Sequence, residues 1–403
     1  MSNFNFLPIL RTIREVALPC IVRWCMLEVL VKTKVIKLDP HKPEIARIRE
    51  AAALVDGGGL VAFPTETVYG IACRVKEDSL AKLDNLKGRT PDKRYTLHIG
   101  QKSEIAKYVP TIALKARKLM KNAWPGPLTI IFELDEQDLL KQQSNLHRQA
   151  FESLYKNGSI GIRCPDSPIA SILLRLVRHP VVAPSANITD RDPATEPEQV
   201  LSQFSGQIEL LLDAGPCKYK KSSTVVKIGK TGLEILRKGV YSQADLEALS
   251  TVRFLFVCTG NTCRSAMAEG IFRKYLAKKL QCEVDQLDRM GYKISSAGIM
   301  KMSAAPASAE AVVACKDRGI DIKNHKSNIL SPQLIEESDF IFAMEQIHCD
   351  RVRAFTPEAA DKCTLLAENK EIADPIGQPE EFFNRCAEMI ENAVRRRIDE
   401  IVI

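Results

Sequence analysis

The sequence has no pair of cysteines separated by two residues, although it holds 12 cysteines among 403 residues. This absence disfavours a zinc ribbon, whose ligands come in such pairs. Internal repeats, low-complexity tracts and collagen-like patterns are absent as well, which disfavours solenoid and fibrous folds. What is present is the composition of an ordinary soluble globular protein, with 45% hydrophobic and 27% charged residues.

A long uninterrupted apolar run is also missing. The most apolar early stretch, residues 16–31, contains charged residues, and Pro19 would break a helix there. The stretch is too short to span a bilayer and lacks the small-residue cleavage pattern of a secretory signal. We therefore predict that residues 1–32 form an N-terminal extension of unassigned role, with the true start near Met26. Scattered cysteines and no membrane partner predict a cytoplasmic location.

Chain length and net charge restrict the number of domains and the class of ligand. A chain of 403 residues is too long for one typical core, so two domains are expected. A net charge of +7 suits anionic ligands such as nucleotides and phosphates, but does not by itself predict a nucleic-acid-binding protein.

The most informative segment is Val-Cys-Thr-Gly-Asn-Thr-Cys-Arg-Ser, residues 257–265. It joins a predicted buried strand, 252–257, to a predicted helix, 265–279, so the free N–H groups of a helix N-terminus point into the loop. Such a loop binds anions. Cys258 gains thiolate character there from the helix terminus and from Arg264, which makes it a candidate nucleophile.

The alternative is that Cys258 is only a small buried hydrophobe, because a lone C-x5-R pattern also arises by chance. The strand–loop–helix context and Ser265, which can hydrogen-bond the sulfur, favour catalysis. A phosphatase of this type needs a general acid. Asp374 is the candidate, since Pro375 stiffens its loop, whereas Asp-Pro on its own is a common turn dipeptide.

Strands and helices alternate through residues 251–403, which predicts a second domain with a doubly wound parallel sheet and ligands at the strand ends. The predicted strands are 252–257, 292–296, 339–344 and 363–366. The predicted helices are 265–279, 305–318, 346–354 and 380–401.

These features resemble the low-molecular-weight protein tyrosine phosphatases. The resemblance rests on the loop at 257–265, on Ser-Ala-Gly at 296–298, on Asp339 before an apolar strand, and on Asp374-Pro375. It implies that Cys258 attacks phosphorus, Arg264 holds the phosphoryl oxygens, and Asp374 protonates the leaving group and then activates water. It implies a phosphorylated protein as substrate and no cofactor. The remaining loop residues would bind the phosphate: Thr259, Gly260, Asn261, Thr262, Cys263 and Ser265.

The same resemblance implies that Asn261 orders the loop and that Ser265 steadies the thiolate. Cys263 would form a reversible disulfide with Cys258 under oxidation. Two positions bear on the substrate. Thr262 resembles the protein-arginine phosphatase branch, and Ile376 stands where tyrosine-specific relatives carry an aromatic residue. Phosphotyrosine and phosphoarginine both remain candidates, and arsenate reduction is disfavoured by poorly spaced cysteines.

The first domain, predicted at residues 33–245, shows short motifs at strand ends. An amphipathic helix at 45–54 precedes a strand at 60–63, which runs into Pro-Thr-Glu-Thr-Val-Tyr-Gly at 64–70. This hydroxyl-rich segment could hold a small polar ligand. It could equally be a turn whose threonine side chains bond to the segment itself.

Together with later motifs, this segment resembles the YrdC-like family, whose members make threonylcarbamoyl-AMP for a tRNA modification. The resemblance covers about 205 residues, and implies an α/β fold with a curved mixed sheet around a basic concavity. It implies that L-threonine, bicarbonate and ATP with Mg²⁺ give threonylcarbamoyl-AMP and pyrophosphate. tRNA or tRNA-modification proteins are further candidate partners.

The resemblance to the YrdC-like family implies ligand-binding roles for particular residues of this chain. The threonine-binding residues would be Thr65, His98 and Thr224. The ATP-binding residues would be Lys87, Arg89, Ser185, Asn187 and Arg237. The lysine and arginines of this set keep a fixed positive charge, which suits the binding of a triphosphate and bicarbonate. No nucleophile stands among these positions, which favours transfer between bound, oriented reactants.

The sequence departs from the family at Thr90, Arg94, Tyr95 and Arg191, which bears on substrate fit. We predict a bifunctional enzyme. The alternative is that the first domain is a non-catalytic nucleotide- or RNA-binding module that regulates the phosphatase.

Overall fold

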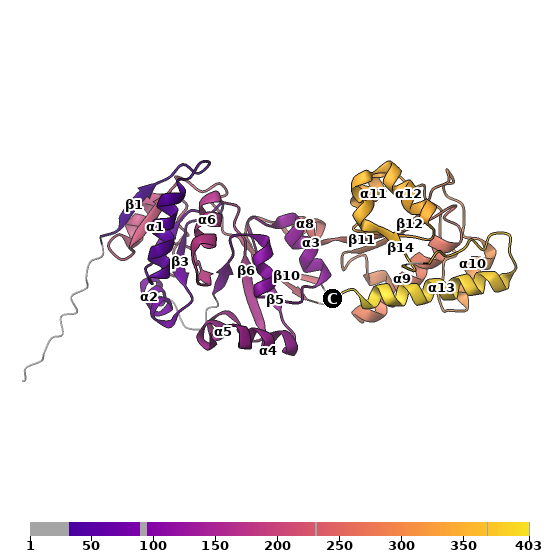
Figure 1. The fold of residues 1–403 in the computed structure, drawn as a ribbon, viewed down its shortest axis with the longest axis horizontal. Coiled ribbons are helices and arrows are strands. Elements are labelled where there is room, and N and C mark those ends of the chain that lie inside the picture. The colour runs from indigo at the N-terminus through magenta and orange to yellow at the C-terminus, as the bar shows by residue number, and fades with distance from the viewer. Residues whose placement is uncertain (1–31, 89–94, 230–231, 369, 403) are drawn as a thin grey trace, which may run out of the picture.

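The protein is represented by a computed structural model that describes residues 32–88, 95–229, 232–368 and 370–402. The described elements form two groups along the chain, each built on its own sheet (Figure 1). The predicted N-terminal extension lies outside the described residues except for Lys32. None of the helices in the described ranges is long and apolar enough to cross a membrane.

The N-terminal domain is built on a mixed sheet of ten strands in the order β1-β8-β2-β3-β7-β4-β6-β5-β9-β10. Its strands are β1 (Lys34–Lys37), β2 (Val61–Phe63), β3 (Gly70–Arg74), β4 (Thr96–His98), β5 (Leu128–Glu133), β6 (Ser159–Arg163), β7 (Val181–Val182), β8 (Leu210–Asp213), β9 (Thr224–Gly229) and β10 (Gly232–Arg237). Its helices are α1 (Ile45–Asp56), α2 (Glu77–Lys87), η1 (Lys102–Lys107), α3 (Leu114–Ala123), α4 (Glu136–Asn145), α5 (Arg148–Leu154), α6 (Pro168–Leu176) and α7 (Pro197–Phe204). This confirms the predicted α/β class and mixed sheet.

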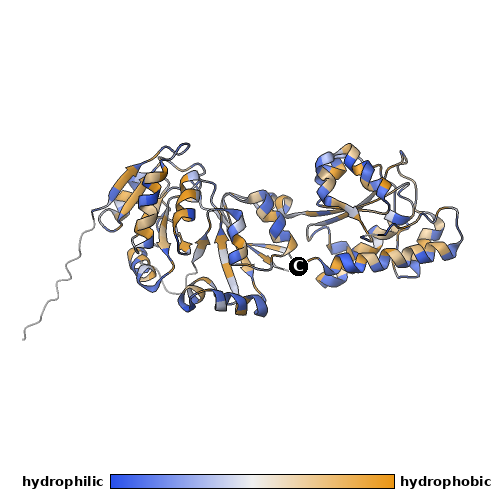
Figure 2. Ribbon diagram, in the orientation of Figure 1, coloured by the Kyte–Doolittle hydropathy of each residue, from blue (hydrophilic) through white to orange (hydrophobic). Residues whose placement is uncertain are grey.

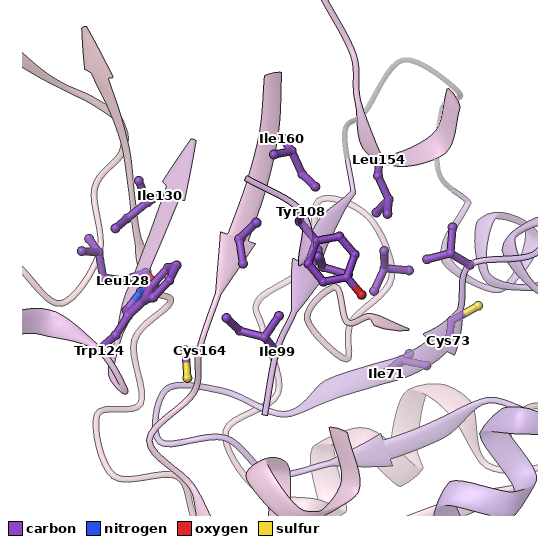
Figure 3. Packing of buried hydrophobic residues seen from close by; sticks show 14 of the residues in the cluster. Ile71, Cys73, Ile99, Tyr108, Trp124, Leu128, Ile130, Leu154, Ile160 and Cys164 are labelled. Carbon is purple, nitrogen blue, oxygen red and sulfur yellow. The ribbon is translucent and has the colours of Figure 1, made fainter. Parts of the chain in front are cut away.

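The period-two alternation of strand side chains divides this core between the two faces of the sheet. In β3, Ile71 and Cys73 join one buried cluster and Ala72 joins the other. Figure 3 shows the first cluster, in which Ile130 of β5 and Ile160 of β6 lie on the same side of the sheet. Central strands such as β2 and β6 are buried along their whole length, so their register is well specified.

The C-terminal domain is built on a four-stranded, all-parallel sheet in the order β12-β11-β13-β14. Its strands are β11 (Val252–Cys258), β12 (Tyr292–Gly298), β13 (Phe340–Ala343) and β14 (Cys363–Leu365). Its helices are α9 (Arg264–Leu280), η2 (Val284–Gln286), α10 (Ala309–Lys316), α11 (Pro332–Glu337), α12 (Gln346–Phe355), η3 (Pro357–Lys362) and α13 (Glu380–Asp399). This confirms the predicted doubly wound parallel sheet.

Helices cover both faces of this sheet, and β11 shows why. Phe254 and Phe256 pack toward α9 and α13, whereas Leu255 and Val257 pack toward α11 and α12. Hydrophobic residues recur along one side of α13 with hydrophilic residues between them (Figure 2). A parallel sheet buried on both faces needs such continuous apolar strands.

The two domains are joined by a short helix. Helix α8 (Gln243–Ser250) begins at Ser242, whose side chain and that of Asp245 form a capping box. The helix packs against α3. The same helix α3 also contacts the C-terminal domain, where Lys115 Nζ donates to the Met290 carbonyl (2.6 Å) and Lys118 pairs with Asp339 (2.5 Å).

Candidate active sites

The anion loop of the C-terminal domain lies where the sequence places it. Strand β11 ends at Cys258 and α9 begins at Arg264, so residues 259–263 connect a strand end to a helix N-terminus. The neighbouring strands β12 and β13 end beside it, since Cys258 pairs with Gly298 and Val257 with Ala343. The loop therefore occupies the carboxyl edge of the sheet, where doubly wound folds bind their ligands.

Asn261 organises the loop. Its backbone lies in the left-handed region (φ 55°), which asparagine tolerates better than most residues. Its amide side chain donates to Ser265 Oγ and to Ser296 Oγ, both at 2.8 Å. Its backbone N–H points at Cys258 Sγ (3.2 Å). Every polar group of this buried residue thus helps to set the loop around the sulfur.

The Ser-Ala-Gly motif at 296–298 supports the loop from β12. Ser296 accepts the Asn261 bond, and Gly298 packs directly under the loop. A Cβ at Gly298 would lie 2.8 Å from the Thr259 carbonyl oxygen and 3.0 Å from Asn261 N. A Cβ at Gly260 would meet only Thr262 Oγ1, at 3.6 Å. Gly298 is therefore the glycine that the packing of the loop requires.

Cys258 is 2% exposed, and its Sγ lies 2.9 Å from Ser265 Oγ. Burial raises the pKa of the Cys258 thiol, while hydrogen bonds from Ser265 and Asn261 and the charge of Arg264 oppose that effect. The sequence predicts a lowered pKa, so the direction is a correction. Its physical reason is the burial of the sulfur, which disfavours the charged thiolate more than the hydrogen bonds and the Arg264 charge favour it. The Arg264 guanidinium is also shared with two carboxylates.

Those carboxylates belong to Asp374 and Glu345. Arg264, 1% exposed, donates through one terminal nitrogen to Asp374 Oδ2 and through the other to Glu345 Oε2 (2.5 Å) and to the Ile372 carbonyl. The predicted nucleophile, phosphate-binding cation and general acid therefore meet at one place. The structure adds Glu345, which the sequence reasoning missed although it directly follows the apolar strand that the motif includes.

The structure also describes the contacts of Cys263 and Asp339, two further residues that the phosphatase resemblance singles out. Cys263 is buried with its thiol free, near Ser308 Oγ (3.4 Å), and Cys258 is also a free thiol. Asp339 lies at the opposite end of β13 from the loop, where it accepts from Arg253 N and pairs with Lys118. Asp339 therefore holds the strand and the domain contact and takes no part in the anion site.

The N-terminal domain contains a cavity of about 270 Å³ at the ends of its strands. Most of the predicted ligand-binding residues line it: Thr65, Lys87, His98, Ser185, Asn187 and Arg237. Arg89 lies outside the described residues. Thr224 is buried and turns away from the cavity, since its hydroxyl exchanges hydrogen bonds with the backbone of Tyr241. Its neighbour Ser223 lines the cavity instead.

Lys87 and Arg237 reach the cavity from two sides. Lys87 Nζ donates to the Ser185 carbonyl (2.6 Å) and to the Asn187 carbonyl. The Arg237 guanidinium donates to the carbonyl and the hydroxyl of Ser223, each at 2.9 Å. These carbonyl and hydroxyl acceptors hold both cations in place at the cavity wall.

Arg163 is the cavity residue that the sequence reasoning missed. It ends β6 and is 5% exposed, with one nitrogen donating to Glu66 Oε1 (2.8 Å) and Thr67 Oγ1 (2.7 Å). Its Nε is buried without a hydrogen-bond partner. The strand end Gly-Ile-Arg-Cys-Pro was the available signal, because an arginine that ends a buried strand needs an anionic or polar partner.

The heptapeptide at 64–70 forms the predicted self-bonded turn and also borders the cavity. Thr65 Oγ1 bonds to Thr67 Oγ1 (2.9 Å) and to the Val68 carbonyl (2.7 Å), as a self-satisfied turn requires. Thr65 also lines the cavity. The turn therefore holds its own hydroxyls in place at the cavity wall.

His98 presents an acceptor to the cavity. Its Nδ1 lies 3.1 Å from the Thr96 carbonyl, which can only accept, so Nδ1 carries the hydrogen and Nε2 the lone pair. Burial, assisted by the charge of Arg163, lowers the pKa of His98 to about 3. The ring is therefore neutral, and adds no charge beside the cations.

Of the residues at which the sequence departs from the YrdC-like pattern, Tyr95 and Arg191 lie away from the cavity, whereas Thr189 and Asp190, in the departing stretch 188–191, line it. The Tyr95 hydroxyl donates to Asp84, and Arg191 is exposed; neither lines the cavity. Thr90 and Arg94 lie outside the described residues.

Two different protein families match two different parts of the chain. The family model for Sua5, YciO and YrdC proteins, described as "Telomere recombination", matches residues 53–239. The model described as "Low molecular weight phosphotyrosine protein phosphatase" matches residues 253–402. A Methanocaldococcus jannaschii relative named for threonylcarbamoyl-AMP synthesis is 30% identical over 213 residues, which cover 52% of this chain and 95% of that protein.

The chain belongs to the threonylcarbamoyl-AMP synthase family and carries a low-molecular-weight phosphotyrosine phosphatase domain. The threonylcarbamoyl-AMP synthase of Bacillus subtilis is 33% identical over 214 residues, or 53% of this chain. The chain spans only 58% of that relative's length. The solved tyrosine phosphatase from T. tengcongensis is 34% identical, with TM-score 0.34, covering 37% of this chain and 99% of its own. The two domains are called the synthase and phosphatase domains below.

Proposed function

We propose that the synthase domain converts L-threonine, bicarbonate and ATP into threonylcarbamoyl-AMP, pyrophosphate and water. The observation that carries this proposal is the cavity itself, whose lining includes the cations Lys87 and Arg237 and a neutral His98. Threonine must first join bicarbonate as a carbamate, whose oxygen then attacks the α-phosphorus of ATP and displaces pyrophosphate. Charge thus moves among anionic groups, and fixed cations stabilise that movement without exchanging protons.

The cavity divides into two ends in this proposal. Thr65, His98 and Arg163 lie together, because β4 pairs with β6 through His98 and Arg163, and the Arg163 guanidinium approaches Thr65 Oγ1 (3.4 Å). The unpartnered Nε of Arg163 would receive the threonine carboxylate. Lys87, with the loop from Ser185 to Asn187, would hold the phosphates of ATP.

Mg²⁺ enters this reaction with ATP as part of the substrate. No cluster of three or more metal-ligating side chains exists in the part of the chain that the structure describes. Asp190 is the carboxylate-bearing residue that lines the cavity. One carboxylate together with substrate phosphates is a usual setting for Mg²⁺, which keeps several of its waters.

The test of the synthase proposal is ATP- and threonine-dependent release of pyrophosphate by the full-length protein. Lys87→Ala should lower the rate by about 100-fold or more, as is typical when one preorganised charge-stabilising donor is removed. Lys107→Ala, on the exposed face of η1, is the matched control. Phosphatase activity reports that the variant is folded. Full pyrophosphate release by Lys87→Ala would contradict the site, and ATP binding without turnover by the parent would favour the regulatory alternative.

We propose further that the phosphatase domain hydrolyses phosphorylated protein side chains through a cysteinyl-phosphate. The observation that carries this is Cys258 held 2.9 Å from Ser265 Oγ, beside Arg264 and Asp374. The Cys258 thiolate attacks phosphorus, the bond to the leaving group breaks, and Asp374 gives that group its proton. Water activated by Asp374 then cleaves the phosphorus–sulfur bond and releases phosphate. The phosphoryl group must compete with Asp374 and Glu345 for the guanidinium.

The phosphorylated side chain is either tyrosine or arginine. Ile376, 66% exposed, follows the general acid where an aromatic residue would flank a phenyl ring. Thr262, which resembles the protein-arginine phosphatase branch, is the second position that favours phosphoarginine as the substrate. Parallel turnover of phosphotyrosine and phosphoarginine substrates decides between them, with Cys258→Ser inactive on both. Thr262→Ile should shift preference toward phosphotyrosine, and an unchanged ratio would remove Thr262 from the argument.

A further inference from the structure

A buried histidine lies under the phosphate-binding loop and has no part in the mechanism above. His348, on the first turn of α12, is fully buried. Its Nδ1 accepts the backbone N–H of Glu345 (3.0 Å), so Nε2 carries the ring hydrogen. That Nε2–H points at Thr259 Oγ1, 3.0 Å away. The histidine therefore has one defined tautomer, and donates to the residue that directly follows the nucleophile.

Thr259 connects this histidine to the catalytic arginine. The same hydroxyl oxygen accepts a hydrogen bond from an Arg264 terminal nitrogen at 3.1 Å. That nitrogen also carries the Asp374 contact. One oxygen atom thus receives the histidine on one side and the guanidinium on the other, which fixes the plane in which the guanidinium faces the loop.

The N-cap residue of α12 makes a second contact with the Arg264 guanidinium. Glu345, the N-cap residue of α12, donates its backbone N–H to His348 and accepts Arg264 with its carboxylate (2.5 Å). The first turn of α12 therefore contacts Arg264 directly through Glu345 and indirectly through His348 and Thr259. Guanidinium recognition of a phosphoryl group depends on this kind of planar, two-point orientation.

We propose that His348 is a positioning residue of the phosphatase site, which acts through Thr259 to orient Arg264 and the loop. The inference rests on the proposed phosphatase function, and assigns no substrate contact to His348. A histidine that only fills the core would stabilise the fold. Any effect of its replacement on turnover would then be the same with or without the Thr259 hydroxyl. A histidine that acts through Thr259 loses its effect once that hydroxyl is removed.

The experiment is a double-mutant cycle in the full-length protein, with p-nitrophenyl phosphate as substrate. His348→Phe keeps a ring of similar shape without the donor, and Thr259→Val keeps the branched shape without the hydroxyl. Each should lower kcat by about 10- to 100-fold, because a misplaced phosphate-binding group costs that much, and KM should change little. The double variant should lose no more than the worse single variant. Thr259→Ser, which restores the hydroxyl, should recover most of kcat.

Arg353→Ala, near the exposed end of α12, is the control for general damage to the helix and should leave kcat unchanged. Losses that multiply in the double variant would overturn the proposal. A His348→Phe variant with lowered thermal stability but normal kcat would overturn it too. Neither result would affect the phosphatase function, which stands if the parent turns over and Cys258→Ser does not.

Binding of inorganic phosphate, measured by calorimetry, separates the remaining cases. If the parent binds phosphate without turnover, the phosphatase function fails, but weaker phosphate binding by His348→Phe still supports the positioning role. Equal binding by parent and His348→Phe overturns that role. A parent that neither binds phosphate nor turns over overturns both proposals.

Discussion

Two buried histidines, one in each domain, are set as neutral hydrogen-bonding groups. Burial lowers the pKa of His98 to about 3 and, helped by the charge of Arg264, that of His348 to about 4. In both rings the hydrogen-bond partners define which nitrogen carries the hydrogen. A histidine held neutral in this way makes a directed hydrogen bond without adding charge beside the arginines that we propose bind anions in each site.

His98 should make the stability of the synthase domain depend on pH. An unfolded histidine titrates near pH 6.5, roughly the ordinary value, whereas the folded ring resists protonation. The contribution is therefore complete above the unfolded pKa and is lost progressively as pH falls from about 6.5 toward about 3.

His98→Gln should flatten the slope of the unfolding free energy against pH between about 6.5 and 4. Urea unfolding followed by fluorescence measures this, because Trp124 is buried in the synthase domain. The same substitution at the exposed His41 controls for loss of a histidine. A slope equal to that of the parent would rule out a buried neutral His98.

At the scale of elements, the alternation of apolar residues identified most strands and helices of the phosphatase domain. The predicted strand at 252–257 is β11 (Val252–Cys258), and the predicted helix at 380–401 is α13 (Glu380–Asp399). Short helices such as α8 and α11 carry too few turns for a clear period. Their formation depends on capping by Ser242 and Ser331 and on packing against neighbours.

The close approach of β12 to the phosphate-binding loop makes Gly298 sensitive to substitution. In Gly298→Ala the new Cβ would meet three backbone atoms of the loop at 2.8 to 3.0 Å, so the loop must move. Phosphatase kcat should fall by about 100-fold, the cost of misplacing catalytic groups by about 1 Å. Pyrophosphate release by the synthase domain should not change. Ser295→Ala, on the same strand, is the control, and normal phosphatase turnover in Gly298→Ala would refute the tight contact.

At the scale of the whole molecule, α3 links the two domains. Lys118 and Asp339 pair across the contact with side chains only 18% and 13% exposed, and Leu114 N donates to the Val402 carbonyl (2.8 Å). The contact lies at the start of β13, whereas Cys258 lies at the end of β11. The phosphatase site therefore opens at the sheet edge opposite to the contact.

Lys118→Ala should weaken the coupling between the domains. Asp339 would keep the Arg253 N–H but lose its cation, which should cost about 1–3 kcal/mol for a partly buried charged group. Calorimetry should show a lower unfolding temperature for the phosphatase domain, or two separated transitions in place of one. Lys121→Ala, exposed on the same helix, is the matched control. Identical traces for both variants would show that the ion pair does not join the domains.

The sequence by itself determined the two families, the α/β class and the proposed catalytic set Cys258, Arg264 and Asp374. It could do so because the loop carries Cys258 and Arg264 within nine consecutive residues, Asp374 stands in a short Asp-Pro motif, and the alternation of apolar residues needs only neighbours along the chain. Only the tertiary structure decided which distant side chains complete the sites. Arg163 and His348 reach them across strands and helices, so their contacts depend on packing. Packing also turned Thr224 away from the cavity and divided the Arg264 charge between two carboxylates.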